Sequence, residues 1–111
     1  MEVLVYDPQG AFSKMLQKSD LSYGEFHVSK DLTDVNFDEN DYVAVVFFAY
    51  SAGDLLSLLG VYKRNIPIIL CSLDKEVYKK AQGVYGVISV DMTKHKSEII
   101  EYFNSILSVT V

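Results

Sequence analysis

The sequence predicts an α/β domain in which a five-stranded parallel sheet is covered by helices on both faces. Short apolar, β-branched segments alternate along the chain with segments whose apolar residues repeat at helical spacing. Two of the apolar segments, residues 42–49 and 67–72, are hydrophobic at nearly every position. Such continuous runs are typical of strands that are buried on both faces of a parallel sheet. The short connections between strands and helices imply right-handed crossovers.

The N-terminal third is expected to contain two strands that flank a short helix. Residues 2–6 are apolar and end at the turn-forming pair Asp7-Pro8, which is typical of a strand. Residues 9–19 carry apolar side chains at helical spacing and lysines between them. Residues 25–29 alternate between polar and apolar side chains, which indicates a half-exposed strand at the edge of the sheet.

The middle of the chain is expected to hold the central strand and the helix that follows it. Residues 30–41 are rich in Asp and Asn, which favour caps and turns, so the second helix is expected to be short or missing. Residues 42–49 form the doubly buried strand. Ser51 and Asp54 then have the spacing of a helix N-terminus. A stripe that should face the core follows at i, i+3, i+4 and i+7: Leu55, Leu58, Leu59 and Tyr62.

The C-terminal half is predicted to continue the alternation with two strands and two helices. Asp74 is placed to cap the first of these helices, and Gly83 to end it. Cys71, the only cysteine, lies within an apolar strand and is expected to be buried and reduced. The predicted elements are a strand, a helix, a strand and a helix at residues 67–72, 75–82, 84–90 and 94–107.

Length, composition and charge indicate a single soluble domain over residues 1–111. Half of the 111 residues are hydrophobic, enough for a core without disulfides or metal. The longest apolar stretch is about half of what a membrane span requires, and the N-terminal apolar run is too short for a signal peptide. We therefore expect a cytoplasmic protein that has no membrane partner. A net charge of −5 without a long basic run disfavours nucleic acid as a partner.

The order of the segments resembles the receiver domain of two-component response regulators over essentially the whole chain. The segment "VLVYDP" is similar to the family's first strand with its acidic pair, and "DYVAVVFF" to the strand that carries the phosphoacceptor. The segment "PIILCS" is similar to the strand that ends in a hydroxyl residue, and "AQGVYGVISVD" to the segment that bears a lysine. The resemblance implies a flavodoxin-like, doubly wound sheet with strand order 2-1-3-4-5.

The residues that carry the family's chemistry are mostly replaced in this chain. The resemblance places the phosphoacceptor at Phe48, which cannot accept a phosphoryl group. Of the acidic pair that would hold Mg²⁺, Asp7 remains and Pro8 replaces its neighbour. The hydroxyl residue is retained as Ser72, whereas the lysine position falls on Val90. The resemblance therefore implies a degenerate receiver, or pseudo-receiver.

Physical chemistry explains why these replacements belong together. Mg²⁺ requires several oxygen ligands in an octahedron, and one carboxylate beside a proline offers too few. A lysine without a phosphate to balance would be an unpaired charge in a half-buried cleft. Phenylalanine at the strand end adds ~1.5 to 3 kcal/mol of burial free energy instead. We therefore expect no enzymatic activity, no cofactor and no metal, and a signal-transduction role through protein–protein interaction with another signalling protein or with a second copy.

Four aspartates near the predicted strand ends permit two interpretations. They could form an acidic cation site, but an aspartate before a helix more often caps its N-terminus. The four are Asp7, Asp54, Asp74 and Asp91. Ser72 could likewise orient a ligand phosphate or simply close a turn.

The tyrosines suggest an interaction surface. Tyr78 and Tyr85 are candidates for an interface, because exposed tyrosine buries much area at little entropic cost. Tyr62, Tyr78 and Tyr102 fit the apolar faces of their helices, which predicts that they face the core. The alternative is that Tyr50, Tyr78 and Tyr85 line the surface formed by the fourth helix, the fifth strand and the fifth helix. The alternative function is a small-ligand sensor for a nucleotide or flavin at the C-terminal edge of the sheet, which would need a cavity near Asp7, Tyr50 and Ser72.

Overall fold

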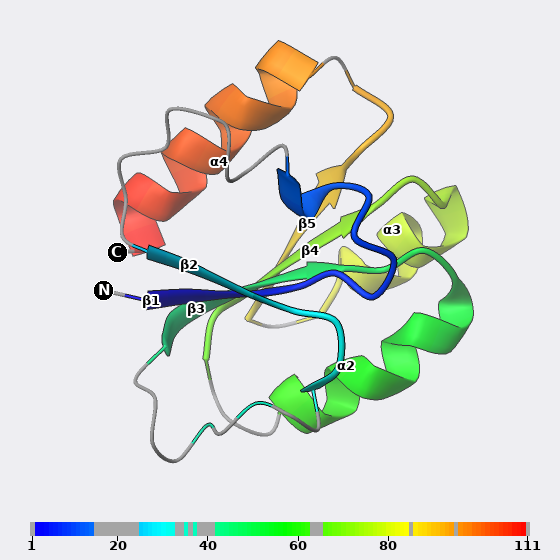
Figure 1. The fold of residues 1–111 in the computed structure, drawn as a ribbon. Coiled ribbons are helices and arrows are strands. Elements are labelled where there is room, and N and C mark those ends of the chain that lie inside the picture. Colours follow the sequence, from blue (N-terminus) through cyan, green and yellow to red (C-terminus); the bar gives the residue numbers. More distant parts are fainter. Residues whose placement is uncertain are drawn as a thin grey trace.

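The computed structural model describes residues 2–14, 25–32, 35, 37, 42–62, 66–84, 86–94 and 96–110. Five parallel strands within these ranges form one sheet in the order β2-β1-β3-β4-β5 (Figure 1). The flavodoxin-like, doubly wound arrangement predicted from the sequence is therefore confirmed. The strands are β1 (Glu2–Tyr6), β2 (Glu25–Ser29), β3 (Tyr42–Phe48), β4 (Ile68–Ser72) and β5 (Val87–Asp91).

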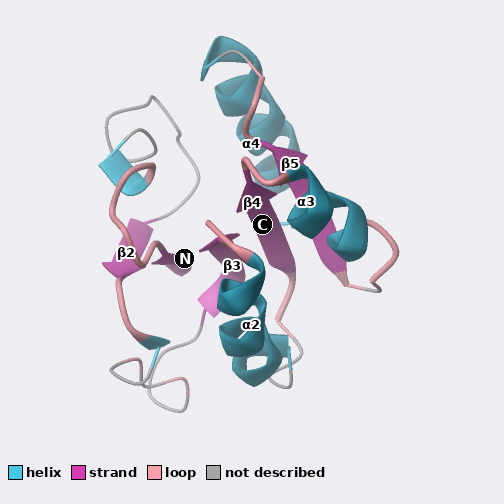
Figure 2. Cartoon of the chain, turned by 90° about the vertical axis from the view of Figure 1, so that its right-hand side faces the viewer, coloured by secondary structure: helices cyan, strands magenta, loops and turns pink. Residues whose placement is uncertain are grey.

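Helices lie on both faces of the sheet. The 3-10 turn η2 (Ala52–Asp54) leads into α2 (Leu55–Tyr62), which shares one face with α3 (Lys75–Ala81). The longer α4 (Lys96–Thr110) lies across the opposite face, as Figure 2 shows from the side. No helix in the described part of the chain is both long and apolar enough to span a membrane.

The two faces of β3 supply two separate hydrophobic layers. Successive strand residues point to opposite faces, so the adjacent Phe47 and Phe48 enter different layers. Phe48 packs in the layer that includes Phe103 of α4, and Phe47 in the layer beneath α2 and α3. The Phe47 ring lies 4.6 Å from that of Tyr6 between centroids. Both layers need apolar side chains, which explains why β3 is hydrophobic at every position.

The strand register brings the carboxyl ends of the strands to one edge of the sheet. Tyr6 of β1 pairs with Ser29 of β2 and with Phe47 of β3. On the other side of β3, Phe48 pairs with Cys71 of β4. Cys71 is 1% exposed, and burial raises the pKa of its thiol well above the usual value.

The end of α3 and the start of β5 differ from the sequence prediction. β5 begins at Val87, three residues later than expected, because Gly86 adopts a φ of +81° and ends a turn. In that turn the N–H of Val84 donates to the carbonyl of Ala81 at 3.2 Å. Helix α3 thus ends at Ala81, and it is Gly86, not Gly83, that provides the left-handed backbone conformation.

Two predicted helices fall partly outside the described residues. Of the helix expected over residues 9–19, Ser13 and Lys14 are helical, and residues 15–24 are not described. Between β2 and β3 the N–H of Val35 donates to the carbonyl of Leu32 at 3.2 Å, which closes a single turn. Residues 33, 34, 36 and 38–41 of that segment lie outside the described ranges.

The prediction that the apolar stripe of α2 faces the core is confirmed for Leu55 and Leu58, which pack against the layer beneath α2 and α3, and is wrong for Leu59 and Tyr62. Val61 is the buried residue of this helix, whereas Leu59 is 60% exposed and Tyr62 is 42% exposed. The physical reason is composition: the sequence LLSLLGVY is apolar around most of the helix, and one sheet face cannot cover all of it. Tyr102 of α4 was also expected in the core and is instead 46% exposed.

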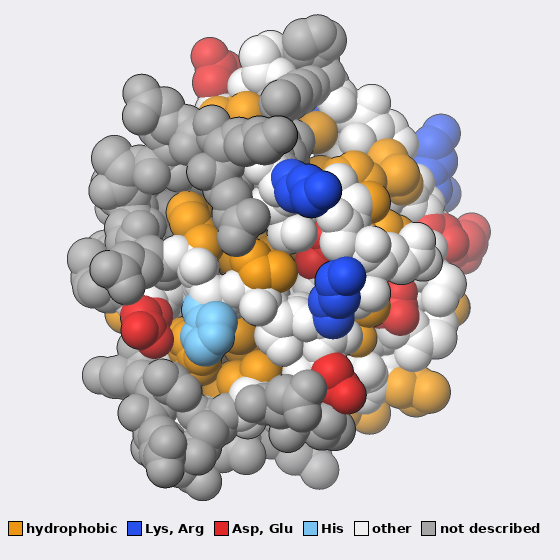
Figure 3. Space-filling view, in the orientation of Figure 1, with side chains coloured by type: hydrophobic (Ala, Val, Ile, Leu, Met, Phe, Trp, Pro, Cys, Tyr) orange, Lys and Arg blue, Asp and Glu red, His pale blue; other side chains and the backbone are white. Residues whose placement is uncertain are grey.

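Charged side chains of both signs are spread over the face shown in Figure 3, with hydrophobic and uncharged side chains between them. Lysine and arginine do not form a continuous area among the side chains described on this face.

Replacement of Phe103 by alanine should lower the free energy of unfolding by about 3–5 kcal/mol, because it leaves a cavity in the layer beneath α4. Phe103 is 0% exposed. The matched control is Tyr102→Ala, which removes a neighbouring aromatic ring from the exposed side of the same helix. Urea denaturation of both variants measures the difference. Equal losses would contradict the packing of α4 described above.

Candidate functional site at the strand ends

Asp7 follows β1 and is completely buried, with a relative exposure of 0%. Its carboxylate accepts four hydrogen bonds. Oδ1 accepts from the N–H of Gly10 at 3.0 Å and from the hydroxyl of Tyr50. Oδ2 accepts from the N–H of Phe12 at 3.1 Å and from the N–H of Ser13 at 2.8 Å. The carboxylate thereby ties the loop after β1 to the end of β3.

These four donors use the acceptor capacity of the carboxylate. An ionised carboxylate has about four lone-pair positions, two on each oxygen. A metal ion bound to Asp7 would have to replace at least one of the four hydrogen bonds. The arrangement is that of a cap, because two of the donors are the N–H groups at the start of the helical segment that begins at Ser13.

The backbone of Gly10 makes this loop possible. Gly10 has a φ of +72°, a conformation that favours glycine. A Cβ atom at this position would also approach Cε of Lys30 to 3.4 Å. Pro8, which replaces the second acid of the resemblance, is half-buried in the same loop.

The electrostatics of Asp7 and Tyr50 agree with this structural role. Burial raises the pKa of Asp7, but the hydrogen bonds from Tyr50 and from the three backbone N–H groups together outweigh it, and the pKa lies below its ordinary value. Burial raises the pKa of Tyr50, and its hydrogen bond to the carboxylate raises it further. At neutral pH a protonated phenol therefore donates to an ionised carboxylate.

Aromatic rings fill the space beside this carboxylate. The Phe12 ring stacks on Phe48 with a centroid distance of 5.5 Å and on Tyr50 with a centroid distance of 5.7 Å. Phe48 is 1% exposed and belongs to the core layer beneath α4. The position that the resemblance assigns to the phosphoacceptor is thus occupied by a packed hydrocarbon ring.

The other two receiver-like positions are also buried. Ser72 is 2% exposed, and its Oγ accepts a hydrogen bond from the N–H of Asp74 at 3.0 Å, as in a turn. Its carbonyl accepts from the N–H of Met92 at 3.0 Å. Val90, where the resemblance would place a lysine, is 3% exposed and packs in the same layer as Phe48.

Asp54 and Asp74 each accept hydrogen bonds from the backbone at the start of a helical segment. Asp54 Oδ2 accepts from the N–H of Tyr50 at 2.7 Å and from that of Ser51 at 3.2 Å. Asp74 Oδ1 accepts from the N–H of Glu76 at 2.9 Å, which makes it the N-cap of α3. Of the two interpretations of these aspartates, helix capping fits the hydrogen bonds of both Asp54 and Asp74.

Asp91 closes the turn between β5 and α4. Its Oδ1 accepts from the N–H of Thr93 at 2.9 Å and from the Thr93 hydroxyl at 2.6 Å, and these hydrogen bonds lower the pKa of Asp91. This turn delays the start of α4 to Lys96, two residues beyond the predicted start. Across the described ranges, no group of three or more His, Cys, Asp or Glu side chains is placed to hold a metal ion.

The two predicted interface tyrosines have different outcomes. Tyr78 of α3 is half-buried and lines a cavity of about 250 Å³ between α3, β5 and α4. Tyr102 of α4, which sequence reasoning placed in the core, lines the same cavity. Tyr85 lies outside the described residues. The structure therefore brings Tyr78 together with Tyr102.

Sequence reasoning missed the contact between Tyr50 and Asp7. The two residues are 43 positions apart, and only the register of β1 and β3 brings them together. The turn itself has a local signal, because Asp-Pro-x-Gly is a pattern in which the aspartate side chain accepts hydrogen bonds from the following backbone. Comparison of the chain with protein-family models, curated proteins and solved structures found no match.

Tyr50→Phe should lower the free energy of unfolding by about 1.5–3 kcal/mol, the usual contribution of a hydrogen bond to a charged group. The variant keeps the ring that stacks on Phe12 and removes only the hydroxyl. Tyr102→Phe, which removes an exposed hydroxyl, should change stability by less than about 0.5 kcal/mol. Thermal and urea denaturation measure both variants. A neutral Tyr50→Phe would show that the hydroxyl contributes nothing to the loop.

Asp7→Asn should reduce the dependence of stability on pH in the acid range. The pKa of Asp7 is lower in the folded chain than in the unfolded chain. Its stabilisation is therefore complete above the unfolded pKa and is lost as pH falls through the folded pKa. Urea denaturation at a series of pH values between neutral and strongly acidic should show the wild-type and variant curves converging as pH falls. Parallel curves would contradict an ionised Asp7.

Proposed function

We propose that this chain is a phosphorylation-independent, receiver-like signalling domain that acts through protein–protein contacts and is not an enzyme. The observation that supports this most directly is the state of the strand ends. Phe48 is packed where the resemblance would place an acceptor carboxylate, and Asp7 already accepts four hydrogen bonds from the protein.

Transfer of a phosphoryl group to a receiver needs three chemical components. It needs a carboxylate that accepts the group, oxygen ligands that hold Mg²⁺, and a cation that balances the added charge. Phe48 has no carboxylate that could accept the phosphoryl group, and Val90 has no cation that could balance the added charge. Asp7 could provide a ligand for Mg²⁺ only by giving up hydrogen bonds that hold its loop. The same residues instead stabilise one conformation of the strand ends.

A domain without a phosphorylation switch must act through its surface. The side of the molecule formed by α3, β5 and α4 supports this role, because it exposes apolar and aromatic side chains around a cavity. Tyr78 and Tyr102 line this cavity, and Tyr102 is 46% exposed. Ile88 of β5 does not line the cavity and is 37% exposed. Tyrosine is enriched at interfaces because it combines a large apolar ring with a hydrogen-bonding group. Another signalling protein or a second copy could occupy this side.

The alternative, a sensor that binds a nucleotide or flavin at the strand ends, has less support. It requires free volume near Asp7, Tyr50 and Ser72. The stacked rings of Phe12, Phe48 and Tyr50 occupy that region. The cavities that the described residues line beside α3, between α2 and α3, and beneath α2 do not include any of the three required residues.

Incubation of the purified chain with acetyl phosphate and Mg²⁺ should leave its mass unchanged. A receiver domain with an intact acidic site, treated in parallel, should gain the mass of one phosphoryl group and serves as the positive control. Intact-mass spectrometry at several time points distinguishes the two results. A stable gain of one phosphoryl group by this chain would refute phosphorylation independence.

A further inference from the structure

A second apolar surface lies between α2 and α3, away from the strand ends. We call it the α2–α3 groove, and its volume is about 300 Å³. Its lining is almost entirely hydrocarbon. Leu58, Leu59 and Tyr62 line it from α2, Lys80 and Ala81 from α3, and Val84 from the turn that follows α3.

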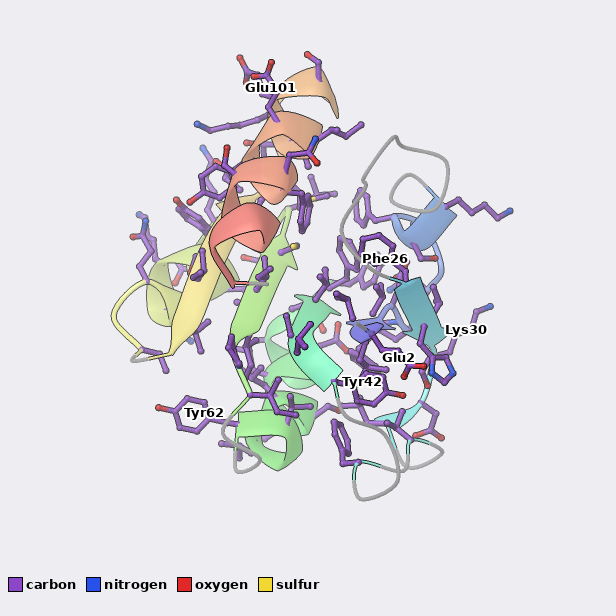
Figure 4. The ribbon with its side chains drawn as sticks, turned by 90° about the vertical axis from the view of Figure 1, so that its left-hand side faces the viewer. Glu2, Phe26, Lys30, Tyr42, Tyr62 and Glu101 are labelled. Carbon is purple, nitrogen blue, oxygen red and sulfur yellow. The ribbon has the colours of Figure 1, made fainter. Side chains whose placement is uncertain are left out.

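The side chains around this groove are unusually accessible for their type. Leu59 is 60% exposed, Tyr62 is 42% exposed and Val84 is 37% exposed. Figure 4 shows Tyr62 projecting from α2 away from the sheet. Burial of apolar surface is favourable at about 25 cal/mol per Å², so a continuous apolar surface of this kind favours an occupant.

The lining also restricts the backbone conformation of an occupant. Most of the groove wall consists of side chains from two helices, which, unlike the edge of a sheet, present no row of backbone N–H and C=O groups to an occupant. An extended peptide placed there would find few partners for its own backbone groups, and leaving them unpaired is costly. A helix satisfies its backbone internally. A helical occupant that presents apolar side chains at i, i+3 or i+4, and i+7 therefore suits this groove.

Charge further restricts the occupant. Among the described residues that line the groove, Lys80 is the only charged one. Lys80 lies in the last turn of α3 next to Lys79. Helix α3 as a whole contains three lysines (Lys75, Lys79 and Lys80) and one acidic residue, Glu76. The whole chain has a net charge of −5. The charge of the described groove lining is therefore positive on a protein whose net charge is negative, which favours an acidic side chain of the partner beside Lys80.

We propose that the α2–α3 groove binds an amphipathic helix of a partner protein, with apolar side chains in the groove and an acidic side chain beside Lys80. This surface is separate from Asp7 and Phe48, and from the tyrosines beside β5. The proposal extends the protein-binding role by naming an acidic amphipathic helix as the partner. It does not depend on whether the chain can be phosphorylated.

The probe is a pair of model helices of about 18 residues, long enough for partial helicity in water. Both peptides carry leucine at i, i+3, i+4 and i+7 on an alanine- and glutamine-rich background. One carries glutamate on both flanks of the leucine stripe and the other carries lysine at the same positions. Titration into the isotope-labelled full chain, followed by amide chemical shifts, should show saturable binding of the glutamate peptide at Leu59, Ala81 and Val84.

Two pairs of variants distinguish binding in the groove from nonspecific binding elsewhere on the surface. Leu59→Ser should weaken binding of the glutamate peptide at least about tenfold, as expected for a central apolar contact. Leu56→Ser should change it less than about twofold, because Leu56 is 74% exposed on the same helix but does not line the groove. Lys80→Glu should weaken the glutamate peptide about threefold and strengthen the lysine peptide similarly. Lys79→Glu should do neither.

Three results would overturn the proposal. The first is that neither peptide binds saturably. The second is that Leu59→Ser and Leu56→Ser have equal effects. The third is that light scattering finds a dimer that Leu59→Ser dissociates, which would identify a second copy as the occupant. A chain that accepts phosphate but binds the glutamate peptide as described would refute only the phosphorylation-independent function.

Discussion

The carboxylate of Asp7 is the interaction on which the strand-end structure depends. Its four donors come from the loop after β1 and from Tyr50 beyond β3, so one side chain fixes two segments that are distant in sequence. Burying a carboxylate is costly unless its oxygens are hydrogen-bonded, and here both oxygens are. The aromatic stack of Phe12 on Phe48 and Tyr50 then covers the same region. Tyr50 takes part in both arrangements, because its hydroxyl donates to Asp7 and its ring stacks on Phe12.

Much of the fold could be predicted because its signals are local. Continuous apolar runs identified β3 and β4, and Asp74 marked the start of α3. The exposure of Leu59 could not be predicted in the same way. A helix that is apolar on most sides gives no information about which side meets the sheet, and the position of α2 beside α3 decides it.

The apolar character of the strand-end region was predictable, but the role of Asp7 there was not. The sequence alone places the apolar residues Phe48 and Val90 at or next to the ends of their strands. What Asp7 does instead depends on Tyr50, and this partner follows from the pairing of β1 with β3, which no local pattern specifies. The exposure of Tyr102 could not be predicted from a local pattern either. Tyr102 has the helical spacing of a core residue and nevertheless lies at the surface.

The position of Cys71 gives the molecule a built-in reporter. Cys71 of β4 pairs with Phe48 of β3 and packs in the core layer beneath α4, where burial keeps the thiol protonated and covered in the folded state. Because the sequence contains no other cysteine, a small thiol-selective reagent can react at one side chain only. The rate of that reaction therefore reports how often the core layer beneath α4 opens, without a substitution that would disturb the sheet.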